Sequence, residues 1–117
     1  MEKTILGLDE HVTLINTHGE KNVLARIDSG ANKSSIDVCL AAEMKLGPVI
    51  DSKIIKSASG SELRPVINIK LRIHDKEIET QFTITDRSHM KYKMLIGQNI
   101  LKNGFLIDCS ISENGEE

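Results

Sequence analysis

The segment Val23-Leu24-Ala25-Arg26-Ile27-Asp28-Ser29-Gly30-Ala31 is the most informative stretch of the sequence. An apolar run typical of a β-strand ends at a carboxylate, and a small, turn-forming trio follows it. In one interpretation, Asp28 stabilises an Asx-type turn by accepting a hydrogen bond from a backbone N–H two residues on. In the other, the carboxylate is partly desolvated at the end of a buried strand and takes part in chemistry, because such a group needs a partner or a proton. The triplet alone leaves both interpretations open.

A second carboxylate would make this segment a catalytic site. Two carboxylates held face to face cannot both ionise, so they share one proton. One then acts as general base on a water molecule, while the protonated one polarises the carbonyl of a peptide bond. Gly30 lets the backbone approach closely, and the Ser29 hydroxyl can hold the turn in place across the pair. The sequence contains one such turn, so the second carboxylate must be the Asp28 of a second copy, as in a two-fold dimer.

Strand patterns dominate the remaining sequence. In Val66–Ile73 and Ile78–Ile84, apolar and polar residues alternate, which is typical of strands with one buried face. Met94–Ile96 and Phe105–Ile107 are short unbroken apolar runs, which predict strands buried on both faces. Polar, turn-forming residues separate the strand segments, so we expect three hairpins. The predicted hairpins join Val12–Ile15 to Val23–Ile27, Ile54–Ile55 to Val66, and Val66–Ile73 to Ile78–Ile84.

Helix signals are few. Asp37 can cap a helix from Val38 to Leu46, which Gly47-Pro48 would end. A shorter helical turn over residues 98–103 is closed by Gly104. The chain is therefore predicted to be mostly β, with six to eight short strands and one or two short helices. Such a chain closes as a barrel or a sandwich, because closure limits exposed strand edges.

The composition fits one small soluble domain. Of the 117 residues only 3% are aromatic, which predicts an aliphatic core. We expect a domain over residues 1–109 and an acidic, disordered tail over residues 110–117. The net charge of −2 comes with no basic cluster, which argues against nucleic acid as a partner. No apolar run approaches the ~20 residues of a membrane helix, and the N-terminus lacks a signal-peptide pattern, so we expect a cytoplasmic protein without a membrane partner.

The two cysteines, Cys39 and Cys109, are able to pair. In a cytoplasmic chain, however, cysteines are more often buried free thiols. We therefore expect free thiols, and the sequence leaves the redox state of both open.

The pattern from Ala25 to Ile36 resembles the active-site segment of retropepsin-like aspartic proteases. Residues 39–47 are similar to the helix that follows this segment in many cellular members, and residues 94–101 resemble the second signature of the fold. The resemblance implies a mostly-β, retropepsin-like closed barrel that forms a single acid-protease lobe with one or two short helices. It also implies a homodimer.

Specific residues follow from this resemblance. Asp28 would be the catalytic residue, and the next three residues would form the active-site turn. In the second signature, an apolar pair and a glycine form a strand that packs beside that turn. The residues concerned are Ser29, Gly30 and Ala31 in the turn, and Leu95, Ile96 and Gly97 in the strand.

A narrower match covers residues 82–97 together with residues 105–108. These residues closely resemble a domain labelled as an ATP-dependent zinc protease, which is often found with ATP-grasp ligases that add glutamate to a ribosomal protein. The two resemblances together extend from about Ile5 to Asp108, and they imply an ATP-grasp ligase as a partner. Members of the narrower family usually carry Arg where this chain has Gln98, so any role of that side chain stays open.

The residues do not support zinc or ATP in this chain. The four histidines are scattered, and no His-Glu-x-x-His motif occurs. Cys39 and Cys109 form no close-spaced ligand pair, and no P-loop is present. We therefore expect no metal and no cofactor here, and any ATP dependence requires a partner that binds ATP.

Arg87 and a hairpin tip are the remaining candidates for binding. Arg87 either forms an ion pair with Asp86 that fixes the loop before Met94, or lies near the active site and binds a carboxylate of the substrate. The association with glutamate ligases makes an acidic peptide tail a candidate substrate. Ser57–Ser61 is small and flexible and falls where retropepsin-like proteins keep their flap. Its tip, Ala58, Ser59 and Gly60, would then contact substrate; the alternative is an exposed loop without function.

The leading hypothesis is an aspartic endopeptidase that hydrolyses peptide bonds as a homodimer. Asp28 and the Asp28 of the second copy would activate the attacking water. The alternative is a catalytically silent peptide-binding or dimerisation module of the same fold. The substrate, the cleavage site and the working pH stay open.

Overall fold

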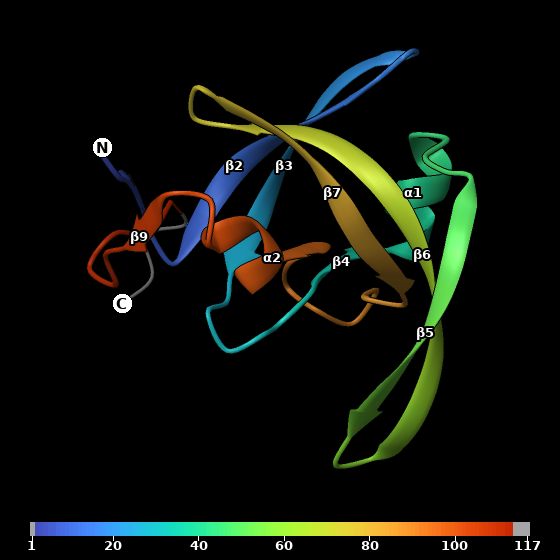
Figure 1. Ribbon diagram of the computed structural model, residues 1–117. Helices are drawn as coiled ribbons and strands as arrows, with labels where there is room; N and C mark the ends of the chain where they lie inside the picture. Colours follow the sequence, from blue (N-terminus) through green and yellow to red (C-terminus); the bar gives the residue numbers. More distant parts are fainter. Residues whose placement is uncertain (1, 114–117) are drawn as a thin grey trace.

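Strands make up most of the chain and close into a barrel (Figure 1). The computed structural model describes residues 2–113. Six strands follow one another around the barrel, and pairing of the last with the first closes it. In order they are β2 (Asp9–Asn16), β3 (Gly19–Ile27), β8 (Met94–Ile96), β4 (Ser34–Asp37), β7 (Lys76–Thr85) and β6 (Gly60–Ile73).

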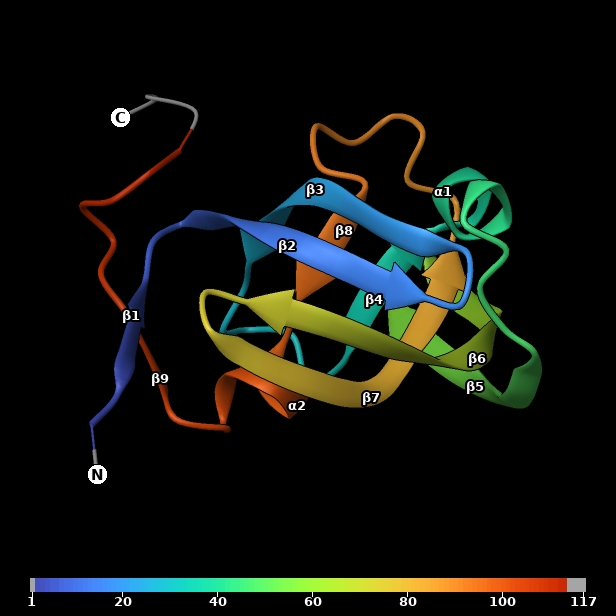
Figure 2. The same cartoon turned by 90° about the horizontal axis from the view of Figure 1, so that it is seen from above.

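Two pieces of β-structure lie outside the barrel. β5 (Val49–Ser57) pairs with the first part of β6, and the resulting hairpin projects away from the barrel (Figure 1). β1 (Thr4–Leu6) and β9 (Phe105–Ile107) form a separate two-stranded parallel sheet. Seen from above, this sheet lies beside the barrel on the side away from helix α1 (Val38–Glu43) (Figure 2). The second helix, α2 (Gln98–Leu101), begins two residues after β8 ends.

The main features of the predicted fold are confirmed. The described residues form a mostly-β closed barrel with two short helices. All three predicted hairpins are present as β2–β3, β5–β6 and β6–β7. The β5–β6 hairpin turns at Ala58 and Ser59, where the sequence predicts its tip. Local turn chemistry and alternation were sufficient to fix these pairings.

The number of strands was underestimated. The described part of the chain contains nine strands, and neither β1 nor β4 was predicted. Every residue of β4 is buried although Ser34, Ser35 and Asp37 are polar, so β4 shows no hydrophobic pattern. The prediction that Phe105–Ile107 is buried on both faces was also wrong, because Leu106 is 51% exposed.

Helix α1 is shorter than predicted, ending at Glu43 instead of Leu46. The predicted cap is present, because the Asp37 carboxylate accepts a hydrogen bond of 3.1 Å from the backbone N–H of Cys39. Lys45 has a φ of 55°, in the left-handed region, and this conformation ends the helix before Leu46. The chain then continues through Gly47 with a φ of 136°.

Both cysteines are free thiols, as expected, but the prediction that they are buried was wrong. Cys39 lies on α1 and Cys109 follows β9, and both are exposed. They come from elements on different sides of the barrel (Figure 2).

The core is aliphatic, as the low aromatic content predicts. Its fully buried side chains come from strands all around the barrel, and Phe82 is the one large aromatic among them. They include Val12, Leu14, Ile36, Ile67, Leu71, Ile73, Met94 and Ile96. Burial of such side chains is the main source of stability in a domain of this size.

The predicted tail over residues 110–117 is described in part. Residues 110–113 follow β9 and contact the body of the domain, for example through the backbone N–H of Glu113, which donates to Asp9. Residues 114–117 lie outside the described residues, so the boundary at residue 109 stays a prediction. Within residues 2–113, no helix combines the length and apolar character needed to span a bilayer.

Candidate active site

Asp28 directly follows β3 and is half-buried. Its backbone N–H donates a hydrogen bond of 2.9 Å to the carbonyl of Ile96, which extends the pairing of β3 with β8 by one step. One carboxylate oxygen accepts a hydrogen bond of 2.9 Å from the backbone N–H of Gly30. The Asx-type turn that the sequence allowed is therefore present. This turn also fixes the direction of the carboxylate, so it is compatible with a chemical role.

Strand β8, with Leu95 and Ile96, packs beside this turn, but Gly97 is not part of the strand as predicted: it is the N-cap of α2. Ile96 pairs with Ile27, directly before Asp28. A Cβ atom on Gly97 would lie 2.3 Å from the carbonyl oxygen of Lys33, so the chain after the turn passes too close for any other residue at position 97. The expected contact between the two signature segments is thus formed through backbone atoms.

A polar network ties these two segments further together. The Ser34 hydroxyl accepts a hydrogen bond of 2.9 Å from the N–H of Gly97 and donates one of 2.7 Å to the Asn99 side chain. Asn99 in turn donates 2.9 Å to the carbonyl of Gln81 on β7. Sequence reasoning did not select Ser34 or Asn99, and their polar side chains give no pattern that would identify them.

Gln98 is the position at which the sequence differs from the narrower family that it resembles, whose members usually carry Arg. Its side-chain nitrogen donates a hydrogen bond of 2.7 Å to the carbonyl of Ser29, and its backbone N–H donates one of 2.8 Å to Ala31. Gln98 thus holds the turn after Asp28 from the side of α2, which is a positioning role.

Arg87 is buried, with 7% of its surface exposed. The predicted ion pair with Asp86 does not form among the described residues; Asp86 instead accepts a hydrogen bond of 2.9 Å from the N–H of Ser88. The Arg87 guanidinium donates a hydrogen bond of 2.9 Å to the carbonyl of Tyr92, and the Arg87 backbone N–H donates one of 2.7 Å to the Asp37 carboxylate. These bonds fix the loop before Met94, as that interpretation expected of Arg87.

Arg87 also faces a cavity of about 530 Å³ next to the Asp28 turn, and Ala31 of that turn lines its wall. Burial is the largest influence on the Arg87 pKa and lowers it, and the positive charge of Arg64 lowers it further. The negative charge of Asp28 acts on the same guanidinium in the opposite direction. Arg87 therefore lies within electrostatic range of Asp28.

The cavity is strongly basic. Ala31 and Leu95, two residues selected from the sequence, line it, and four cationic side chains share its wall while no acidic side chain does. The cationic residues are Lys33, Lys56, Arg64 and Arg87. A cavity with this lining is suited to an anionic group.

The predicted flap residues lie elsewhere in this protomer. Ser59 and Gly60 line an adjoining polar cavity of about 270 Å³, which shares Ile55 and Arg64 with the basic cavity, and Ala58 is at the turn itself. The hairpin residues that line the basic cavity are instead Ile55, Lys56 and Arg64. Sequence reasoning missed these three residues. The pairing of Ile54 with Leu63 fixes which residues face the body, and this register is visible only once the hairpin is aligned.

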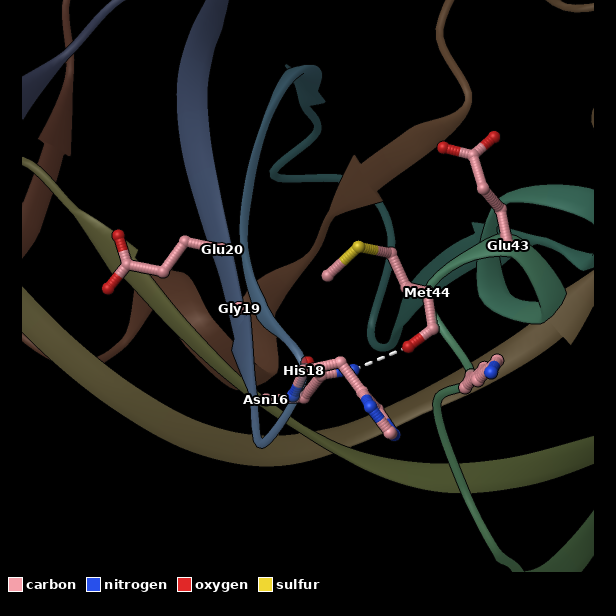
Figure 3. A pocket seen from close by; sticks show the side chains of 7 residues that line it. Asn16, His18, Gly19, Glu20, Glu43 and Met44 are labelled. Atoms are coloured by element: carbon pink, nitrogen blue, oxygen red, sulfur yellow. Dashed lines mark hydrogen bonds between the residues drawn. The ribbon is translucent and has the colours of Figure 1, made fainter.

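A smaller cavity of about 200 Å³ lies at the far end of the β2–β3 hairpin (Figure 3). Asn16 donates a hydrogen bond to the carbonyl of Met44 across it, and His18, Glu20 and Glu43 surround it. The whole of β3 separates this cavity from Asp28, roughly 25 Å along the strand. It is not part of the candidate site.

The histidines and cysteines do not gather into a site. Across residues 2–113, no three His, Cys, Asp or Glu side chains are grouped as metal ligands would be. His74 lies 3.1 Å from Glu10, at the opposite end of β2 from His18.

Solved structures with this fold include proteases. A protein of unknown function from Legionella pneumophila superposes with a TM-score of 0.66 at 18% identity, covering 93% of this chain and 95% of that protein. The EIAV protease, solved with an inhibitor, gives a TM-score of 0.66 at 17% identity, over 81% of this chain and 85% of the protease. The protease of simian foamy virus gives 0.57 at 15% identity, over 80% of this chain and 91% of the protease. These similarities establish a retropepsin-like fold.

Curated relatives are longer than this chain. A protein from Desulfotalea psychrophila named "probable alpha-L-glutamate ligase" is 30% identical over 144 aligned positions, which cover 98% of this chain and 31% of that protein. A protein of the same name from Shewanella pealeana is 31% identical over 138 positions, covering 94% of this chain and 29% of that protein. The chain thus spans less than a third of the length of these relatives.

The family itself is identified by the second half of the fold. Residues 40–114 match the family described as retropepsin-like aspartic endopeptidase RimB. This range contains Arg87 and the second signature, Leu95, Ile96 and Gly97, and the Asp28 turn precedes it. The chain belongs to the RimB-like family of retropepsin-like aspartic endopeptidases.

Proposed function

We propose that the chain is a cytoplasmic aspartic endopeptidase that acts as a homodimer. The observation that carries this proposal is the placement of Asp28: it directly follows β3, it is oriented by Gly30, and it lies beside β8 in a retropepsin-like fold. A C2 axis next to this turn would bring Asp28 of one copy against Asp28 of the other.

The chemistry requires one shared proton between the two carboxylates. The ionised Asp28 removes a proton from a water molecule as the water oxygen attacks the peptide carbonyl carbon. The protonated Asp28 gives its proton to the carbonyl oxygen, so a neutral gem-diol forms. Collapse of this intermediate breaks the C–N bond, and a proton passes to the leaving nitrogen.

Exposed apolar side chains next to the Asp28 turn support the proposed dimer. Ile5, Leu8, Leu106 and Ile111 are each between 40% and 51% exposed. Ile5 pairs with Leu106 in the β1–β9 sheet, and the N–H of Leu8 donates 2.8 Å to the carbonyl of Ile111. The carbonyl of Leu8 accepts from Ile27, directly before Asp28. Apolar side chains gathered on a two-stranded sheet with open edges favour pairing with another copy.

The basic cavity favours an acidic peptide as substrate. Lys33, Lys56, Arg64 and Arg87 would bind carboxylates of such a peptide while it lies extended under the β5–β6 hairpin, whose tip is Ala58, Ser59 and Gly60. Relatives named as glutamate ligases support the same choice, because a ligase that adds glutamates makes an acidic chain. We propose glutamate-rich tails as the substrate and an ATP-grasp ligase as a functional partner.

The test compares the native chain with Asp28→Asn on a peptide that ends in several glutamates, with products identified by mass spectrometry. We expect the variant to lose about 10²–10⁴-fold or more in cleavage rate, because it removes the general base. Asp75→Asn makes the same chemical change in the exposed β6–β7 turn and should cleave at the native rate. Full activity in Asp28→Asn would refute the proposal. Binding of the peptide without cleavage by the native dimer would favour the silent binding module.

A further inference from the structure

Glu62 on β6 places a carboxylate beside the basic cavity. Arg64, two residues along the strand, donates from its Nε atom to a Glu62 carboxylate oxygen. The Thr85 hydroxyl at the end of β7 contacts the two oxygens of the same carboxylate at 3.3 and 3.4 Å. Glu62 thus contacts both the hairpin and the barrel.

These contacts lie where the hairpin leaves the barrel. The ladder between β6 and β7 begins with Val66 opposite Thr83, and toward the hairpin tip β6 pairs with β5 instead (Figure 1). Glu62 and Thr85 bridge the two strands just beyond the first ladder pair. The carboxylate therefore lies at the edge of the space into which a substrate would enter beneath the hairpin.

Arg64 is distinct among the cations of the cavity. Of the four basic side chains in its wall, Arg64 alone has an ion-pair partner within the described part of the chain. Arg64 is also close enough to Arg87 to lower the pKa of that guanidinium, after the larger effect of burial. A carboxylate bound to Arg64 therefore offsets repulsion between two arginines that face the same cavity.

We propose that Arg64 is a specificity-determining residue and that Glu62 is its internal competitor, a carboxylate that an acidic side chain of the substrate displaces. This inference rests on the proposed substrate class. Displacement exchanges one Arg–carboxylate pair for another, so Arg64 stays paired throughout. Glu62 then competes with the carboxylates of an acidic ligand for Arg64, and it leaves the binding of ligands without a carboxylate unchanged.

The ionisation of Glu62 supports this competition. The hydrogen bond from Arg64 is the largest influence on the Glu62 pKa and lowers it below its usual range. Glu62 therefore stays charged wherever the glutamates of a peptide are charged.

Binding can be measured separately from catalysis in the Asp28→Asn background. The probes are fluorescein-labelled hexaglutamate and hexaglutamine, followed by fluorescence anisotropy. Glu62→Gln should tighten hexaglutamate binding about two- to fivefold, the range expected of an exposed ion pair. Arg64→Gln should weaken it by a similar or larger factor, and the double variant should equal Arg64→Gln alone, because the competitor acts only through Arg64. Hexaglutamine binding should change less than twofold in every variant.

Glu77→Gln is the matched control. Glu77 is an exposed glutamate of the β6–β7 hairpin, 3.4 Å from Lys70, so its substitution removes the same charge and also one ion pair. If Glu77→Gln and Glu62→Gln tighten hexaglutamate binding equally, the change in net charge alone explains the effect, and the proposal is overturned. A gain from Glu62→Gln that persists without Arg64 would overturn it as well.

The outcome is distinguishable from failure of the proposed function. If chains with Asp28 intact cleave glutamate peptides but Glu62→Gln leaves binding unchanged, the competitor is refuted and the protease stands. If the predicted binding pattern appears without cleavage by the native chain, the competitor stands and the catalytic proposal fails. If the Asp28→Asn chain with Glu62 and Arg64 intact does not bind hexaglutamate more tightly than hexaglutamine, the substrate class and the competitor are both refuted.

Discussion

At the scale of single residues, the site depends on close backbone contacts. Asp28 is oriented by one hydrogen bond from Gly30, and the turn it begins is held by the second signature through Gly97 and Gln98. Gly97 has a φ of −106°, which any residue adopts, so its requirement for glycine is steric. The carbonyl oxygens of Ala31 and Lys33 occupy the space where a Cβ atom would stand.

We therefore predict that Gly97→Ala destabilises the domain. The added Cβ would meet the carbonyl oxygens of Lys33 and Ala31 at 2.3 and 2.8 Å, and the backbone must move to relieve the overlap. A loss of about 1–3 kcal/mol or more in the free energy of unfolding is expected, measured by urea denaturation. Gly30→Ala is the control, since its Cβ would meet only the Asp28 carboxylate at 3.2 Å. Equal stability losses in the two variants would contradict this account.

At the scale of elements, the start of β2 connects three parts of the chain. Asp9 is fully buried and accepts hydrogen bonds of 2.6 Å from the Tyr92 hydroxyl and from the N–H of Glu113. Ser112 contacts the same carboxylate at 3.4 Å. Asp9 thereby joins the barrel to the loop before β8 and to the segment after β9.

The pKa of Asp9 reflects this network. Burial is the largest single influence and raises the pKa, but the hydrogen bonds from Tyr92, Glu113 and Ser112 together bring it below its usual range. A carboxyl group with a lowered pKa in the folded state stabilises the fold above its unfolded pKa of about 3.9. That stabilisation is lost as the pH falls through the lower pKa of the folded state.

Tyr92→Phe should therefore reduce stability in a pH-dependent way. At pH 6 we expect a loss of about 1–3 kcal/mol, because a short hydrogen bond to a buried, charged carboxylate disappears. Below the unfolded pKa of Asp9 the difference from the native chain should shrink. Urea denaturation of both chains at pH 6 and at pH 3 measures this difference in the free energy of unfolding. Ser112→Ala, which removes only a contact of 3.4 Å, should cost less at pH 6. A Tyr92→Phe difference that is the same at both pH values would exclude the ionised Asp9 as its cause.

At the scale of the whole molecule, the proposed dimer requires each protomer to supply half of the site. The barrel places Asp28, the basic cavity and the apolar β1–β9 surface close together, and the projecting β5–β6 hairpin supplies Ile55, Lys56 and Arg64 to the wall of that cavity (Figures 1 and 2). A cavity lined by Ser29, Gln98 and Leu106 connects the Asp28 turn to this apolar surface. If the chain acts as the proposed dimer, activity depends on assembly.

Leu106→Lys is predicted to disrupt the dimer and abolish peptide cleavage while leaving the fold intact. Leu106 is 51% exposed in the protomer, so a lysine there is accommodated when the chain is alone and is costly in an apolar interface. Sedimentation velocity gives the assembly state, and circular dichroism checks the fold. Val49 is the first residue of β5 and is 57% exposed, and β5 and β9 lie on different sides of the barrel (Figure 2). Val49→Lys should therefore stay dimeric and active. A native chain that is monomeric and fully active would rule out the shared site.

The sequence alone was sufficient for the hairpins, the Asp28 turn, the capped start of α1 and the resemblance to an acid-protease lobe. These features depend on neighbours in the chain, so alternation, turn residues and caps encode them locally. Strand β4 could not be predicted, because polar Ser34, Ser35 and Asp37 are buried by partners from β7, β8 and the loop at Arg87. The exposure of Leu106 likewise depends on where β9 lies.

Only the tertiary structure brought the basic side chains together. Lys33, Lys56, Arg64 and Arg87 are spread over more than fifty positions, and the sequence contains no basic cluster. Barrel closure places the chain after Asp28, the β5–β6 hairpin and the loop after β7 around one cavity. These residues are far apart in the sequence and meet only because distant strands pair. Which strands pair depends on burial of the whole core and not on neighbouring residues. The sequence therefore identified the Asp28 turn, and the fold determined which charges lie near it.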